Sequence, residues 1–161
     1  MIEKLISEMI IYYHGDPKRI QHFMKVHDFA RTIAVLENLD KETLFTLETA
    51  AVVHDIGIHI SEEKYSSAAG KYQELEGPPL AEEMLTRLGF PEDVISRVCY
   101  LVGHHHTYQN IDGADYQILV EADFLVNLYE DQASEKAAIH ACDAVFQTET
   151  GRRFCREMFG L

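Results

Sequence analysis

The sequence has no long apolar run and no excess of positive charge. No uninterrupted hydrophobic stretch approaches the roughly 20 residues that a membrane-spanning helix needs. The N-terminal stretch MIEKLISEMIIYYHG has acidic residues among its apolar ones and no small-residue cleavage site. The 14 Lys and Arg are outnumbered by 27 Asp and Glu, for a formal charge of −13. Nucleic-acid backbones require a basic surface, so this charge argues against binding to a nucleic-acid polymer. Because neither a membrane-spanning run nor a cleavage site is found, we also predict a cytoplasmic protein that does not bind a membrane.

Cysteine is also scarce. The three cysteines, Cys99, Cys142 and Cys155, are odd in number and widely spaced, and no CxxC pair is present. This excludes a disulfide framework and a zinc ribbon. Histidine is the residue in excess, with nine copies that include the triplet His104-His105-His106.

What the sequence does contain is helical periodicity along nearly all of its 161 residues, a length that suits one compact domain. We predict an all-α fold, a single compact helical bundle over residues 1–161. Helices are expected at 2–13, 17–39, from Asp40 to Gly57, and at 78–89, 91–106, 116–130 and 134–146. Residues 58–77 are expected to be mostly loop with short helical turns, and residues from 148 onward receive no assignment.

Metal-competent side chains lie on the inward faces of several predicted helices. They are His22, His54 with the adjoining Asp55, His105 and Asp123. One histidine on an apolar face is more often an ordinary core residue, but four helices that each contribute one such group are harder to attribute to chance. A buried Asp123 costs several kcal/mol unless it is paired or coordinated. A shared cation would satisfy the whole set, and imidazole with carboxylate suits Mn, Fe, Co, Ni or Zn.

Three segments carry a family resemblance. The runs QHFMKV, LETAAVVHDIG and ILVEADFL resemble the motifs of the HD-domain superfamily of metal-dependent phosphohydrolases. The resemblance covers residues 18–130 and implies that the helices on either side pack on this core. It identifies His22, and not His27, as the first histidine of the family motif. It implies a metal held by His22, His54, Asp55 and Asp123, and hydrolysis of a small phosphorylated molecule by attack of metal-bound hydroxide on phosphorus. A nucleotide is the leading substrate class.

The resemblance also suggests roles for the remaining polar residues. Asp55 could accept a proton from the attacking water, and His105 could donate to the leaving group, bind the phosphate or act as a further ligand. Some members bind two metals through additional histidines, but Gln73 stands where one of them is expected, so we predict a single ion, or a weaker second one, rather than a full dinuclear centre. Candidate phosphate contacts are His104, His106 and Lys71. Either of the two histidines could instead contact a second metal, and a polar helix end explains them equally well.

Two other functions stay open at this stage. Some HD-fold proteins use a diiron centre for oxygen chemistry, and Gln73 counts against this because such chemistry needs both metals. A non-catalytic protein that binds a metal or nucleotide and signals to a partner is the other alternative, although the sequence shows no attached output module. A second His-Asp pair, His27-Asp28, lies one step off the inward stripe and is expected to be solvated surface.

Overall fold

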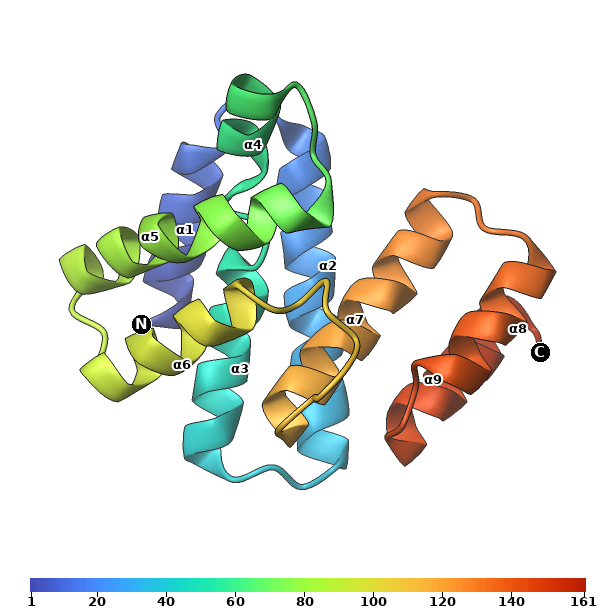
Figure 1. Cartoon of the computed structure of the whole chain (residues 1–161). Coiled ribbons are helices and arrows are strands. Elements are labelled where there is room, and N and C mark those ends of the chain that lie inside the picture. Colours follow the sequence, from blue (N-terminus) through green and yellow to red (C-terminus); the bar gives the residue numbers. More distant parts are fainter.

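The computed structural model describes all 161 residues and contains nine helices and no strand (Figure 1), which confirms the all-α prediction. The helices are α1 (Ile2–Tyr12), α2 (Pro17–Leu36), α3 (Lys41–Val53), α4 (Ile58–Tyr65), α5 (Gly70–Leu88), α6 (Glu92–Val102), α7 (Ala114–Glu130), α8 (Glu135–Ala144) and α9 (Glu149–Phe159). None of them combines the length and the apolarity that crossing a bilayer requires.

Helix α3 occupies the centre of the molecule. It packs against α1, α2, α6 and α7 (Figure 1), and its last four residues, 50–53, are fully buried. A helix surrounded in this way needs apolar side chains on every face. The buried position of the helix explains why four apolar residues, AAVV, follow one another directly before His54 and Asp55. Because α3 ends inside the core, these two polar residues also lie there.

Local capping fixes where α2 and α3 begin. The side chain of Asp16 accepts a hydrogen bond from the amide of Arg19, with Pro17 at the first helical position. The side chain of Asp40 accepts from the amides of Glu42 and Thr43. Both helices begin where predicted, because Asp satisfies the free N–H groups of a first helical turn and proline tolerates that position.

Gly57 lies in the turn between α3 and α4, where the predicted helix was expected to end. Its φ is −79°, which any residue can adopt. A Cβ at this position would lie 2.7 Å from the amide nitrogen of Gly77 on α5. The glycine is needed because the two backbones approach closely, so it fixes the path of the chain immediately after Asp55.

The expectation of loop at 58–77 is wrong. Within this range, residues 58–65 form α4 and residues 70–77 form the first part of α5, and Pro78 and Pro79 lie inside α5 instead of opening it. The buried residues of the two helices include small or polar ones such as Ser61, Gln73 and Gly77. Such residues give a weak hydrophobic period, and packing of α5 against α6 overrides the local cost of the prolines.

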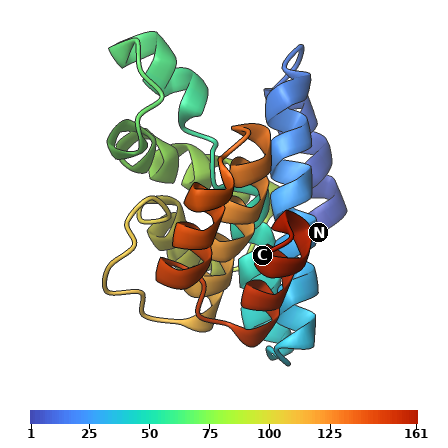
Figure 2. The same cartoon turned by 90° about the vertical axis from the view of Figure 1, so that its right-hand side faces the viewer.

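The last two helices form a hairpin, and α9 packs on α2 and α7 (Figure 2). Helix α9 occupies the segment from residue 148 onward, for which no prediction was made. The fully buried Glu121 of α7 anchors it, because its carboxylate accepts hydrogen bonds from the amides of Gln147 and Thr148 and from the Thr148 hydroxyl. This tertiary contact has no counterpart in the helical periodicity.

Candidate metal centre

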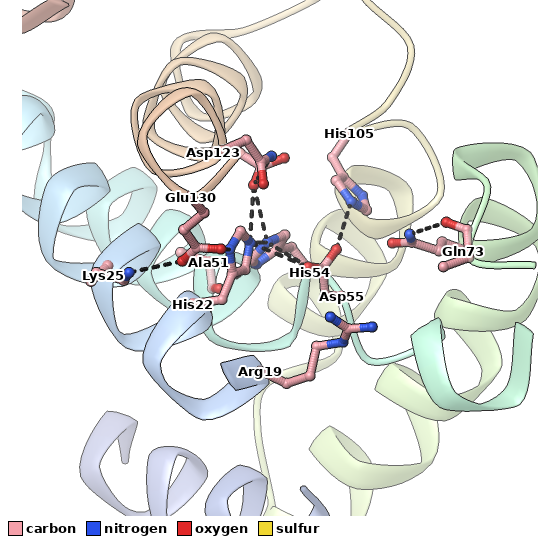
Figure 3. Close-up of polar contacts among 12 residues, drawn as sticks. Arg19, His22, Lys25, Ala51, His54, Asp55, Gln73, His105, Asp123 and Glu130 are labelled. Atoms are coloured by element: carbon pink, nitrogen blue, oxygen red, sulfur yellow. Dashed lines mark hydrogen bonds and ion pairs between the residues drawn. The ribbon is translucent and has the colours of Figure 1, made fainter. Parts of the chain in front are cut away.

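Four of the predicted ligands, contributed by three helices, meet in the core. His22 comes from α2, His54 and Asp55 from the end of α3, and Asp123 from α7 (Figure 3). The Nε2 atom of His22 lies 3.2 Å from Nε2 of His54, 3.2 Å from Oδ1 of Asp123 and 3.3 Å from Oδ2 of Asp55. The structure therefore brings together every residue of the predicted set.

Each histidine of the cluster is oriented through its Nδ1 atom. Nδ1 of His22 donates to Oε2 of Glu130 at 3.1 Å, and Nδ1 of His54 donates to the carbonyl of Ala51 at 2.7 Å. Nδ1 of His105 donates to the carbonyl of Val102 at 2.9 Å. When neutral, each imidazole therefore directs the lone pair of Nε2 at the carboxylates, which is the arrangement that metal-ligating histidines show.

The carboxylates and imidazoles of the cluster require a positive charge between them. Burial by itself would lower the pKa of His54, but the charge of Asp55 and the hydrogen bond to Asp123 raise it well above its usual value. Burial would raise the pKa of Asp123, but hydrogen bonds from His22 and His54 bring it below its usual value. Lone pairs and carboxylates at these distances repel one another unless a proton or a cation lies between them, and the donor set fits a divalent transition metal.

Asp55 also faces a second pair of histidines. Its Oδ1 atom lies 3.4 Å from Nε2 of His105, and that nitrogen is buried without a hydrogen-bond partner. His106 is adjacent, and one potential ligand atom from each of Asp55, His105 and His106 lies within 4.8 Å of the others. Burial and the neighbouring His105 lower the pKa of His106 to about 4, so its imidazole is neutral at pH 7.

Two tyrosines of the first helical hairpin hold the turn that carries Asp55. The hydroxyl of Tyr13 donates to the carbonyl of Asp55 at 2.6 Å, and that of Tyr12 donates to the carbonyl of Ile56 at 2.9 Å. Neither tyrosine was predicted from the sequence, because both fit the pattern of an amphipathic helix. Glu130 was not predicted either, although a residue seven positions after Asp123 lies on the same face of a helix.

A small cavity of about 140 Å³ opens onto the cluster, and its lining includes His22, Asp55 and Asp123 together with Lys18 and Arg19. Arg19 donates to Glu62 at 2.6 Å, while its Nε is buried without a partner. Neither cationic residue was predicted from the sequence, because the direction of its side chain depends on how α2 packs.

Two predicted phosphate contacts do not reach this cavity. Lys71 is exposed, with Nζ 4.8 Å from the centre of the Tyr72 ring. The ring of His104 stacks on Tyr100, with centroids 4.0 Å apart, and its Nδ1 donates to the Tyr100 carbonyl. His106 does line the cavity, and His105 is buried behind its surface. The structure therefore does not support Lys71 or His104 as substrate contacts, nor His105 as a donor to a leaving group.

The other His-Asp pair lies outside the cluster. His27 is half-buried and its Nε2 lies 3.0 Å from Oε1 of Glu48, so it is paired and not simply solvated as expected. Asp28 is exposed.

Two larger cavities, of about 490 and 470 Å³, lie away from the cluster. Arg97 in the first is already paired with Asp112 and Asp115, and neither cavity contains converging imidazoles.

Comparison with known proteins gives one family match and a structural neighbour. A family model described as an HD domain matches residues 19–145. The crystal structure of a predicted HD superfamily hydrolase from an uncultured Thermotogales bacterium is similar, with a TM-score of 0.70 and 23% sequence identity over 98% of this chain and 84% of that one. This likeness shows the shared fold. No curated protein sequence matches the chain.

Proposed function

The chain belongs to the HD-domain family, and from this premise and the geometry of the cluster we propose that it is a metal-dependent phosphohydrolase. One observation carries the proposal. The Nε2 atoms of His22 and His54 each lie within 3.5 Å of both the Asp55 and the Asp123 carboxylates, and both imidazoles are fixed through Nδ1. The structural neighbour, described as a predicted hydrolase, supports the same class of activity.

His22, His54, Asp55 and Asp123 would hold the metal, chosen from Mn, Fe, Co, Ni and Zn. A divalent ion supplies Lewis acidity, lowering the pKa of water and polarising a phosphoryl oxygen. Asp55 lines the cavity and is placed to accept a hydrogen bond from the attacking water and so to orient it. Nearby histidine charges hold the pKa of Asp55 well below its usual value despite burial, which favours this orienting role over retention of the proton.

Arg19 and Lys18 are the residues that we propose for binding the substrate phosphate. The cavity is lined by four carboxylates, those of Asp55, Asp123, Glu130 and Asp131, against these two cationic side chains. A phosphoryl group would be repelled from this surface until a bound cation offsets the carboxylates. The unpartnered Nε of Arg19 can then donate to a phosphate oxygen, which a guanidinium recognises well.

A cavity of about 140 Å³ accommodates a phosphoryl group, since one water takes up roughly 30 Å³ in the liquid. The rest of the substrate would then extend outside it. We propose a small phosphorylated molecule, with nucleotides as the class to test first. Neither a nucleic-acid polymer nor a membrane is part of this proposal, and the cytoplasm is the expected compartment.

The direct test is phosphate release from nucleotides and phosphorylated sugars by protein loaded in turn with each of the five metals. We expect turnover that depends on the metal and is abolished in Asp55→Asn. Asp28→Asn is the matched control, because Asp28 is the exposed aspartate of the other His-Asp pair, and it should retain full turnover. Metal-independent turnover, or an active Asp55→Asn variant, would contradict the proposal.

One observation favours the oxidative alternative as a second candidate. The group formed by Asp55, His105 and His106 adjoins the first cluster, and oxygen chemistry at a diiron centre needs two adjacent ions. Oxygen consumption by iron-loaded protein with polyol or phosphonate substrates would support this candidate. Tight nucleotide binding without any turnover would instead support the non-catalytic role.

A further inference from the structure

Three arginines lie close together on the exposed face of α9, at one edge of the molecule (Figure 1). The helix buries the side that includes Gly151 and Cys155, whereas Arg152, Arg153 and Arg156 are exposed. The chain carries a formal charge of −13. A cluster of cationic side chains therefore differs from the acidic character of the chain as a whole.

These three arginines differ from the others in having no carboxylate partner. Every other arginine of the chain lies within 3.4 Å of a carboxylate oxygen, namely Arg19, Arg31, Arg87 and Arg97. On α9 the spacing would allow Arg153 to pair with Glu149 or Glu157, four residues before and after it, but neither ion pair is present. The three guanidinium groups therefore keep N–H donors that are free to bind an anion.

Two of the guanidinium groups are held in place by contacts that leave donors free. Nε of Arg152 donates to the carbonyl of Phe146 at 2.8 Å. The guanidinium carbon of Arg153 lies 5.5 Å from the centre of the Phe154 ring, a distance at which a cation is attracted to the face of the ring. Binding an anion therefore costs less side-chain ordering here than it would for freely rotating arginines.

Arg152 and Arg156 also repel each other. They are four residues apart, so their side chains are neighbours on the surface of the helix, and like charges at this spacing destabilise it. The stability of α9 alone does not account for the pair. An anion bound between the two side chains would offset the repulsion, because each guanidinium would then donate charged hydrogen bonds to it.

A cavity of about 470 Å³ lies against these side chains. It is lined by the three arginines together with Gln147, Glu149 and Glu157. None of these residues is apolar, so the cavity offers no surface for a nucleobase or an acyl chain, and its guanidinium groups outnumber its carboxylates. The helix rises about 6 Å between the first and the last arginine, at roughly 1.5 Å per residue. The donors therefore suit a compact anion.

We propose that this face of α9 binds a small molecule with two or more adjacent phosphoryl groups, through Arg152, Arg153 and Arg156. Guanidinium groups bind phosphate oxygens through parallel hydrogen bonds, and a compact oligophosphate has enough oxygens to engage all three. The site needs no metal, unlike the core cavity, whose carboxylates repel a phosphoryl group until a cation is bound. The inference does not rest on the proposed function.

The experiment is isothermal titration calorimetry of the full chain with inorganic triphosphate, in a chelator that keeps metal out of the core cluster. We expect one triphosphate to bind per wild-type chain. Because Arg156 would donate charged hydrogen bonds to the ligand, Arg156→Ala should raise the dissociation constant about ten-fold. Arg152→Lys keeps the charge but loses the planar fork of donors, and it should also weaken binding. Circular dichroism verifies that each variant is folded.

Arg87→Ala is the matched control, because it removes the same charge from an exposed arginine that is already paired with Glu8. It should bind triphosphate like the wild type. An equal loss of affinity in Arg87→Ala would mean that only the overall charge matters and would overturn the site, as would a wild type that does not bind. A hexaglutamate peptide that bound as tightly would overturn the phosphoryl class and favour an acidic protein segment. None of these results bears on metal-dependent turnover, by which the proposed function is tested.

Discussion

Replacing Glu130 tests whether the outer hydrogen bonds of the cluster prepare it for a metal. Oε2 of Glu130 accepts from Nδ1 of His22 at 3.1 Å, and its Oε1 accepts from Lys25 at 2.8 Å. In Glu130→Ala the His22 ring loses the acceptor that fixes its tautomer and rotation. The ring then has to be reoriented each time it binds a metal.

The structure sets the size of this effect. The Glu130 side chain is 17% exposed and that of His22 is 7% exposed, so solvent screens their hydrogen bond only slightly. Losing an outer-shell partner costs about 10–100-fold in metal affinity, which corresponds to about 1.4–2.8 kcal/mol. This agrees with the roughly 1.5–3 kcal/mol of a hydrogen bond to a charged group. We therefore expect the dissociation constant for Mn²⁺ to rise by about 10–100-fold.

The assay is isothermal titration calorimetry of metal-free protein, with circular dichroism to verify that each variant is folded. Glu130→Gln keeps an acceptor oxygen and should lose less affinity than Glu130→Ala. The exposed Glu63 of α4 provides the control variant Glu63→Ala, which should bind like the wild type. A folded Glu130→Ala variant with wild-type affinity would refute the role given to this hydrogen bond.

Three further predictions concern the supports of the centre. Tyr13→Phe removes the 2.6 Å hydrogen bond to the Asp55 carbonyl. Because such a hydrogen bond contributes about 1 kcal/mol, we expect roughly five-fold weaker Mn²⁺ binding. Unchanged binding would contradict the role of the tyrosine. The pKa of His54 is raised in the folded chain, so its stabilising charge is complete below the unfolded pKa of about 6.5 and is lost as the pH rises through the folded value. In chelator the unfolding temperature should therefore fall from about pH 6.5 upward, and a rise over that range would be inconsistent with this pKa. A Cβ in Gly151→Ala would lie 2.0 Å from Oε2 of Glu121. The free energy of unfolding measured by urea denaturation should therefore fall by about 1–3 kcal/mol. An unchanged free energy would mean that Glu121 does not anchor α9.

The sequence was informative wherever local chemistry decides the structure. The Asp16 and Asp40 caps began α2 and α3 where predicted, because each cap depends only on its own first turn. Helical phase also placed His22, His54 and Asp123 on inward faces, because a period of 3.6 residues fixes which side chains share a side of a helix.

Residues whose direction depends on tertiary packing could not be placed in this way. Lys71 and His104 carry suitable chemistry but point away from the cavity, whereas Arg19 and Lys18 line it because of how α2 packs. The helix at 58–65 and the early start of α5 were missed because small and polar residues are buried there. The position of α9 depends on hydrogen bonds to Glu121 from residues 26 and 27 positions further along the chain.

Metal content per chain tests the central claim most directly. The protein is purified without chelator and measured by inductively coupled plasma mass spectrometry beside His54→Ala and His140→Ala, with circular dichroism to verify folding. His140 is exposed on α8 and serves as the matched control. We predict one or two transition-metal ions per chain in the wild type and in His140→Ala, and few in His54→Ala. No metal in any of the three, even after soaking with Mn, Fe and Co, would contradict the account.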